Sequence, residues 1–154
     1  MKALFLFFLL LAPSASSFAD CWIEAGARYG IEPELLQAIA IVESSLNPKA
    51  TNTNRNGSAD YGLMQINSSH LPVLKQFNIT TSHLLNDPCH NVMTGAWILA
   101  GNIRQYGYTW DAVGAYNAGT AKTPKHQKLR EKYIHKVAPE YFKLKSASKN
   151  GQQQ

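Results

Sequence analysis

Residues 33–45, Pro-Glu-Leu-Leu-Gln-Ala-Ile-Ala-Ile-Val-Glu-Ser-Ser, predict an amphipathic helix that carries the most informative side chain of the sequence. Pro33 suits the first helical turn, because an amide hydrogen there would have no partner. At 100° per residue an arc of about 120° contains four apolar side chains, and Glu43 falls inside it. The four are Leu36, Ile39, Ala40 and Leu46. Burying a carboxylate is costly unless it is paired or protonated. Glu43 is therefore a candidate general acid with a raised pKa, and the alternative is a buried glutamate satisfied by a structural partner.

A second carboxylate, Asp60, follows at the end of a polar stretch, residues 49–61. The dipeptide Asn56-Gly57 in this stretch favours a small β-hairpin. One carboxyl in an apolar environment and one in a wet environment are what glycosidic cleavage uses. The acid protonates the leaving oxygen, and the anion stabilises positive charge on the sugar ring. The alternative for Asp60 is a residue that caps a turn.

The rest of the chain predicts a mostly helical α+β domain with one small β-hairpin. The 154 residues, 45% of them hydrophobic, suffice for one domain with a single core. Start and stop residues predict further helices at 20–29, 87–107, 110–117 and 123–145, with domain 20–145 followed by a disordered tail at 146–154.

The first 19 residues predict a secretory signal peptide, removed after Ala19. A membrane anchor is the alternative, but an apolar run of ten residues is short for a membrane span, so stable membrane insertion is not expected. Export would place the chain in the periplasm, where Cys21 and Cys89 are expected to form a disulfide. That bond would close a loop of about 68 residues and contribute roughly 4 kcal/mol to stability. The alternative is two unpaired, buried thiols.

Charge is distributed unevenly. Residues 20–121 hold five Lys or Arg against eight Asp or Glu, whereas residues 122–154 hold nine against two. The basic C-terminal segment suggests an anionic partner, or equally a solvated helix face. The rest of the chain has no basic patch with interleaved aromatic residues, which argues against nucleic acid. The five histidines lack metal-ligand spacing, so no metal is expected.

Three motifs occur in order along the chain: Glu-Ser-Ser at 43–45, Gly-Leu-Met-Gln-Ile-Asn at 62–67 and Ala-Tyr-Asn-Ala-Gly at 115–119. Together they resemble the lytic transglycosylase family, lysozyme-like enzymes that cut peptidoglycan. The resemblance covers residues 21–141. The short length, signal peptide and basic tail resemble the small, invasion-associated members that accompany type III secretion systems; relatives serve conjugation and pilus machines.

This resemblance implies a lysozyme-like fold and a role for individual residues. Glu43 matches the single catalytic acid and base of the family, and Tyr133 matches a tyrosine that helps to hold the site. Positions that line the sugar groove are Met64, Gln65, Tyr116 and Asn117. Core packing is the alternative for Met64 and Tyr116, and structural hydrogen bonding is the alternative for Gln65, Asn117 and Tyr133.

Asp60 departs from the family pattern, in which most members have a small residue. Residues 59–67, Ala-Asp-Tyr-Gly-Leu-Met-Gln-Ile-Asn, are similar to the segment that carries the second carboxylate in animal-type lysozymes. The sequence is therefore compatible with two different products. A transglycosylase forms a 1,6-anhydro end without water, whereas a lysozyme uses water.

The expected function is cleavage of the β-1,4 bond between N-acetylmuramic acid and N-acetylglucosamine by a monomer that needs no cofactor. Peptidoglycan glycan strands are the expected partner, with a structural protein of a secretion system as a further candidate. A non-catalytic wall-binding module is the remaining alternative. The position of Glu43 in an apolar arc argues against that module, because a binding groove has no use for a costly buried acid.

Overall fold

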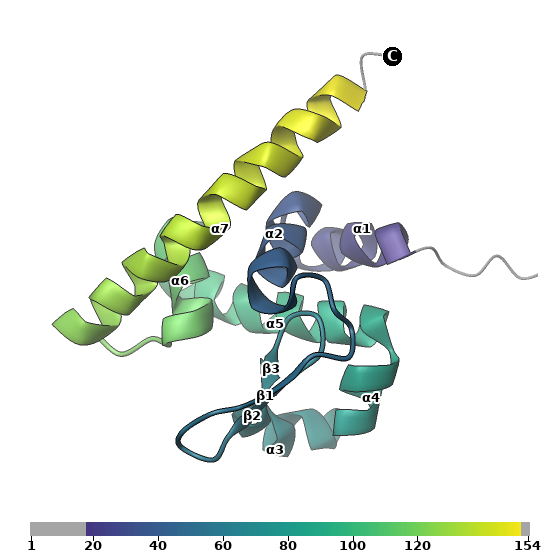
Figure 1. Ribbon diagram of the computed structural model, residues 1–154, viewed down its shortest axis with the longest axis vertical. Helices are drawn as coiled ribbons and strands as arrows, with labels where there is room; N and C mark the ends of the chain where they lie inside the picture. Colours follow the sequence, from purple (N-terminus) through teal and green to yellow (C-terminus); the bar gives the residue numbers. More distant parts are fainter. Residues whose placement is uncertain (1–17, 152–154) are drawn as a thin grey trace, which may run out of the picture.

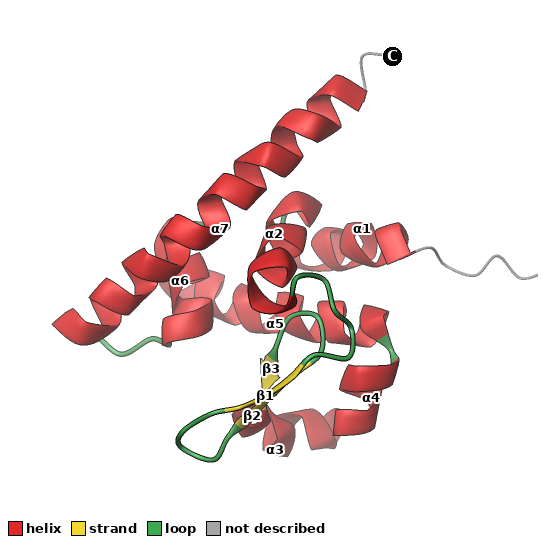
Figure 2. Ribbon diagram, viewed as in Figure 1, coloured by secondary structure: helices red, strands yellow, loops and turns green. Residues whose placement is uncertain are grey.

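The computed structural model describes residues 18–151, and this part of the chain contains seven α-helices and one small antiparallel sheet (Figures 1 and 2). The helices are α1 (Phe18–Tyr29), α2 (Pro33–Ser44), α3 (Leu71–Leu74), α4 (Thr81–Asn86), α5 (Pro88–Tyr106), α6 (Trp110–Ala118) and α7 (Pro124–Gly151). The strands are β1 (Thr51–Thr53), β2 (Ala59–Tyr61) and β3 (Ile66–Asn67), and 3₁₀ turns span Ser68–His70 and Lys75–Phe77. The α+β, mostly helical class predicted from the sequence is confirmed.

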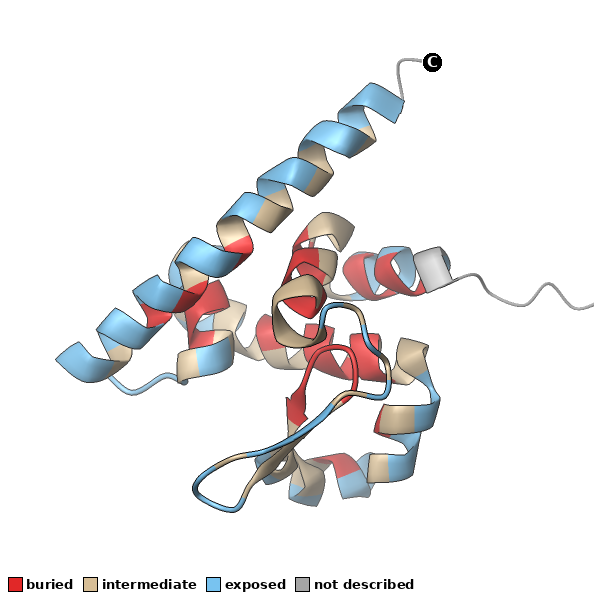
Figure 3. Cartoon of the chain, in the orientation of Figure 1, coloured by how far each residue is buried: buried red, intermediate tan, exposed pale blue. Residues whose placement is uncertain are grey.

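The helical body is arranged around α5. This helix packs against α1 and α6, and α7 crosses over both α6 and α2 (Figure 1). Leu36 and Ile39 of α2, Leu99 of α5 and Val137 of α7 are completely buried. Figure 3 shows that buried positions concentrate where α2, α5 and the turn after β2 meet, whereas the outer face of α7 is exposed. One core therefore supports both ends of α2, the helix that carries Glu43.

The sheet has the strand order β1-β2-β3, with both pairs antiparallel. The predicted hairpin is formed by β1 and β2, and the structure adds β3, which the sequence did not indicate. A tight turn brings β3 back against β2, and Gly62 in this turn has φ +75°. A Cβ atom at Gly62 would lie 2.2 Å from the Asn91 side chain, so the close approach of sheet and α5 requires glycine there.

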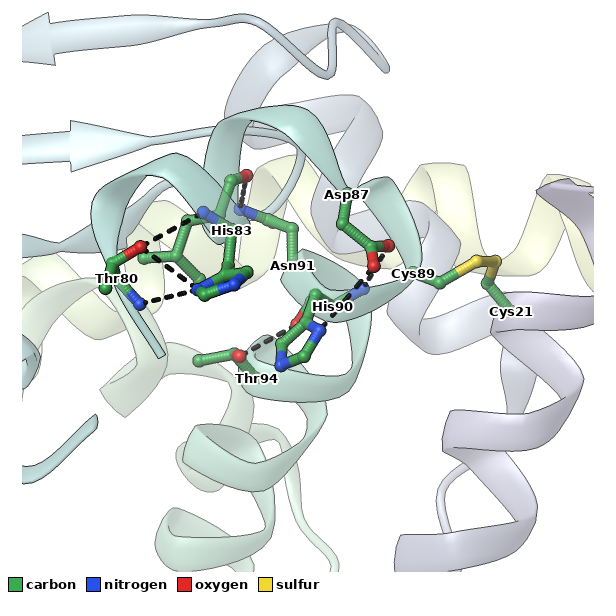
Figure 4. Close-up of polar contacts among 9 residues, drawn as sticks. Cys21, Thr80, His83, Asp87, Cys89, His90, Asn91 and Thr94 are labelled. Carbon is green, nitrogen blue, oxygen red and sulfur yellow. Dashed lines mark hydrogen bonds and ion pairs between the residues drawn. A yellow bond between two sulfur atoms is a disulfide. The ribbon is translucent and has the colours of Figure 1, made fainter. Parts of the chain in front are cut away.

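The corner between α4 and α5 attaches the sheet and α1 to the helical body (Figure 4). Asp87 caps α5 by accepting a hydrogen bond from the His90 amide at 3.0 Å, with Pro88 in the first turn, as the sequence predicted. The fully buried Asn91 accepts from the Met64 amide at 2.8 Å and donates to the carbonyls of residues 61 and 84. Cys21 on α1 and Cys89 on α5 form the expected disulfide.

The C-terminal helix is longer than predicted. It continues to Gly151, so residues 146–151 are helical instead of forming the expected disordered tail. Two contacts with the start of α2 explain the extension. Lys145 pairs with Glu32 at 2.9 Å, and the Ser148 hydroxyl donates to Glu34 at 3.0 Å. Contacts between residues this far apart in the sequence cannot be predicted from the local pattern of polar and apolar residues.

Residues 1–17, which hold nearly all of the expected signal peptide, and residues 152–154 lie outside the described part of the chain. Among the helices of residues 18–151, none is long and apolar enough to cross a membrane. In the same range, no group of three or more His, Cys, Asp or Glu side chains is arranged to hold a metal ion.

Candidate active site

A polar cleft of about 790 Å³ separates the sheet from α5 and α6. Five of the side chains singled out in the sequence line it: Glu43, Asp60, Gln65, Tyr116 and Asn117. They come from α2, β2, the turn after β2, and α6. The fold therefore brings together residues that lie up to 74 positions apart, in a hollow that contains both carboxyls.

Glu43 lies in the last turn of α2, partly buried, and its Oε1 accepts a hydrogen bond from the Tyr133 hydroxyl at 2.6 Å. Burial is the main reason that the pKa of Glu43 is raised to about 7. The Tyr133 hydrogen bond opposes this rise, the negative charge of Asp60 adds to it, and the charge of Lys136 opposes it. The pKa of Tyr133 is well above its usual value, mainly because of burial, so this hydroxyl keeps its proton. Glu43 can therefore donate a proton near neutral pH and take one back.

The two serines that follow Glu43 fix its position. The Ser44 hydroxyl donates to the Leu63 carbonyl at 2.7 Å, which ties the end of α2 to the turn between β2 and β3. Ser45 and Leu46 adopt left-handed backbone conformations, with φ 53° and 62°, and end the helix. In the sequence these serines belong to the first of the three motifs, which by itself indicates no role for them. Their adjacency to Glu43 was the available signal.

Asp60 lies on the central strand and is held by two amides. Its Oδ1 accepts from Asn67 at 2.6 Å, and its Oδ2 accepts from Asn54 at 2.8 Å. Asn54 and Asn67 come from either side of β2, so the carboxyl has a fixed orientation at the cleft wall. The sequence did not single out either asparagine. Their density in the polar stretch, and the position of Asn67 at the end of the second motif, were the signals.

Gln65 borders the cleft, but its amide is used within the protein. The side chain is 9% exposed; its oxygen accepts from Asn52 at 2.6 Å, and its nitrogen donates to the carbonyls of Ala50 and Gly62. These bonds hold β1 against the turn after β2. Structural hydrogen bonding, the alternative considered for this residue, is therefore what the structure shows.

The structure corrects the expected placement of Met64. Its side chain is completely buried and packs on Gly95 of α5, where an added Cβ would lie 2.4 Å from the methionine sulfur. It does not line the cleft, and core packing, the alternative, describes it. The backbone carbonyl of Met64 accepts a hydrogen bond from the Tyr116 hydroxyl at 2.8 Å, so Tyr116 reaches the cleft with its ring and is anchored by its hydroxyl.

The fold and the site together define a class of enzyme. A small sheet beside a helical body, a polar cleft between them, and one glutamic acid with a raised pKa in its wall are the arrangement of lysozyme-like enzymes that cleave glycan chains. A second carboxyl on the sheet completes it.

The sequence belongs to the family described as "Transglycosylase SLT domain", whose family model matches residues 20–138. Its enzymatic class is therefore that of the lytic transglycosylases, with peptidoglycan as substrate. "Invasion protein IagB" of Salmonella typhimurium (strain SL1344) is 47% identical over 148 residues, covering 96% of this chain and 91% of the relative. "Protein IpgF" of Shigella flexneri is 43% identical and covers 94% of each chain. "Peptidoglycan-binding-like protein" of Escherichia coli O157:H7 is 40% identical, covering 94% and 90%.

Proposed function

We propose that this enzyme cleaves the β-1,4 bond between N-acetylmuramic acid and N-acetylglucosamine and leaves a 1,6-anhydro end on the muramoyl residue. One observation carries the proposal. Glu43 is a single carboxyl with a pKa of about 7, held by Tyr133 in the wall of a polar cleft that also contains Asp60. A pKa near the working pH suits a group that must both donate and accept a proton.

In the first step the protonated Glu43 gives its proton to the glycosidic oxygen. The bond between this oxygen and the anomeric carbon breaks, and its electron pair stays with the leaving N-acetylglucosamine. Positive charge develops on the muramoyl ring and is stabilised by the carboxylate of Asp60. Asn54 and Asn67 keep that carboxylate in place during the change of charge.

In the second step the ionised Glu43 takes the proton of the muramoyl 6-hydroxyl. The oxygen attacks the anomeric carbon of the same ring, which closes the anhydro bridge and returns Glu43 to its protonated state. Water is not consumed. Tyr133 donates to Glu43 throughout and stabilises the carboxylate that exists between the two steps.

Asp60 favours a second candidate, hydrolysis in the manner of a lysozyme. A fixed carboxylate in the cleft matches the two-carboxyl arrangement of enzymes in which water attacks the sugar. Digestion of purified sacculi in water enriched in heavy oxygen separates the two. Mass spectrometry is expected to find muramoyl ends that are one water lighter and unlabelled. Labelled reducing ends would assign hydrolysis instead.

We further propose that the enzyme is exported to the periplasm, acts there as a monomer, and opens the wall locally for a secretion apparatus. The N-terminal sequence supports export, and the similarity to proteins named for invasion supports the cellular role. Mass spectrometry of periplasmic protein should find a chain that begins at Asp20. A chromosomal Glu43→Gln substitution should reduce secretion with normal protein levels. Normal secretion by that strain would contradict the proposed role in secretion. Full wall lysis by the purified variant would mean that a group other than Glu43 is the catalytic acid.

A further inference from the structure

Glu43 borders two hollows. The first is the cleft that contains Asp60, and the second, of about 220 Å³, lies on the side of α7. The second hollow is lined by Val42, Glu43, Asn117, Leu129, Lys132, Tyr133 and Lys136. Because Glu43 and Asn117 line both, the hollows adjoin beside the acid. A substituent of a sugar bound in the cleft therefore has a place to go that the catalytic steps do not use.

Two lysines give this second hollow its charge. Lys132 and Lys136 are one helical turn apart on α7, so their side chains share a face. Within residues 18–151, neither ammonium has an ion-pair partner, whereas Lys145 further along the same helix is paired with Glu32. Both lysines are exposed and free to bind an anion brought by the substrate.

We propose that Lys132 and Lys136 bind a carboxylate of the stem peptide that peptidoglycan carries on its muramoyl residues. The inference rests on the proposed function, because it assigns the second hollow to a substituent of the substrate in the cleft. Stem peptides bear free carboxylates, and a lysine ammonium binds a carboxylate by a charge-assisted hydrogen bond. The pair makes the enzyme selective for glycan that still carries its peptides.

The two lysines belong to a longer row on α7. Lys125, Lys132, Lys136 and Lys143 fall within an arc of about 40° when successive residues are placed 100° apart. All four are exposed. The row raises the local concentration of an anionic polymer, but only its two middle members line the hollow beside Glu43. The outer members therefore provide a matched control with the same change of charge.

The test compares the double variant Lys132→Gln/Lys136→Gln with wild type on two substrates: soluble glycan strands that carry stem peptides, and the same strands after an amidase has removed them. We expect the ratio of kcat/KM values, peptide-bearing over peptide-free, to fall about tenfold, as expected for the loss of two partly exposed charge-assisted contacts. The ratio cancels any general effect of the variant on Glu43. Lys132→Arg/Lys136→Arg should keep the wild-type ratio, and so should Lys125→Gln/Lys143→Gln.

Two results would overturn the inference. They are an unchanged ratio, which includes an equal loss on both substrates, and an equal fall of the ratio in the Lys125→Gln/Lys143→Gln control. The last would assign the effect to total charge and not to the hollow.

A binding measurement separates this inference from the catalytic proposal. In a Glu43→Gln background, titration with the two kinds of strand should show tighter binding of the peptide-bearing one, and this preference should disappear when Lys132 and Lys136 are also replaced by Gln. The result does not depend on which product the enzyme forms. Equal affinity for the two strands in the Glu43→Gln background would overturn the stem-peptide site, even if anhydro products confirm the reaction.

Discussion

The two ends of α2 make an instructive comparison, because each has a glutamate that accepts a hydrogen bond from a tyrosine of α7. Before the first turn, Glu32 accepts from Tyr141. In the last turn, Glu43 accepts from Tyr133 at 2.6 Å. The pKa of Glu32 is nevertheless lowered, by its hydrogen bonds to Tyr141 and Lys145, whereas the pKa of Glu43 is raised to about 7 by burial.

A hydrogen bond from tyrosine lowers the pKa of both glutamates, so this bond does not explain why the two pKa values differ; the rest of the environment does. Glu32 lies at the N-terminus of the helix, where the helix dipole favours an anion, and Lys145 supplies a cation at 2.9 Å. Glu43 lies at the opposite end, where the dipole disfavours an anion, and it is more deeply buried. Glu32 and its partners on α7 form a structural clamp, which holds α7 to the start of α2. Glu43 is instead an acid that can exchange a proton near neutral pH.

Glu43→Gln should have the largest effect, because it keeps the shape of the side chain and removes the proton. We expect the rate of wall lysis to fall by roughly 10² to 10⁴ with the fold intact, the usual contribution of a general acid. A turbidity assay on purified sacculi measures the rate, and circular dichroism checks the fold. Lysis near the wild-type rate would remove Glu43 from the mechanism.

Glu43→Gln should also show how much the buried negative charge of ionised Glu43 destabilises the folded protein. Glu43 binds its proton more tightly in the folded protein than in the unfolded chain, so its contribution to the free energy of unfolding decreases as pH rises from 4.5 to 7. The free energy of unfolding of Glu43→Gln, measured relative to that of wild type, should therefore increase by up to about 3 kcal/mol between pH 4 and pH 8. Thermal unfolding of both proteins across this range measures it, and a pH-independent difference would contradict the raised pKa.

Asp60→Asn tests the charge on the sheet. We expect kcat to fall about tenfold with little change in KM, because the anion acts on charge that develops in the transition state. The alkaline limb of the pH–rate profile should also move to lower pH, since a negative charge that raises the pKa of Glu43 is lost. A variant that keeps full activity and merely melts earlier would show that Asp60 is a turn residue.

Tyr133→Phe and Tyr141→Phe are matched variants, because each removes the hydroxyl that donates to one of the two glutamates. Loss of the Tyr133 hydroxyl should raise the pKa of Glu43, extend activity to higher pH, and reduce kcat roughly fivefold, since one hydrogen bond contributes about 1 kcal/mol. Tyr141→Phe should leave the pH–rate profile unchanged. Identical profiles for the two variants would mean that Tyr133 is only structural.

Lys145→Met should have the smallest effect. It breaks the partly exposed pair with Glu32 and should lower the melting temperature slightly, by an amount that high salt removes, with unchanged kcat on soluble glycan. Lys149→Met, on the same helix, is the control. A loss of activity in Lys145→Met would show that the clamp at Glu32 supports the cleft at the other end of α2.

The comparison also shows what the sequence could predict. The position of Glu43 in an apolar arc is a local property of one helix, so it was available from spacing alone. The contact with Tyr133 spans 90 positions and came only from the family resemblance, and the Glu32–Tyr141 contact, which spans 109, gave no signal. The placement of Met64 was wrong because a motif position does not say which side of a turn faces the cleft. The helical tail was missed because its partners, Glu32 and Glu34, lie at the other end of the sequence.

Because α7 is the last helix to be synthesised, the order of synthesis affects when the site is completed. This last helix carries Tyr133, both lysines of the second hollow, and the two residues that bind Glu32, Tyr141 and Lys145. A nascent chain, which emerges from its N-terminus onward, holds Glu43 and Asp60 long before it holds the tyrosine that orients the acid. Assembly of the site therefore waits for the final segment, and a protein cut short before residue 133 is a wall-degrading enzyme without an oriented acid.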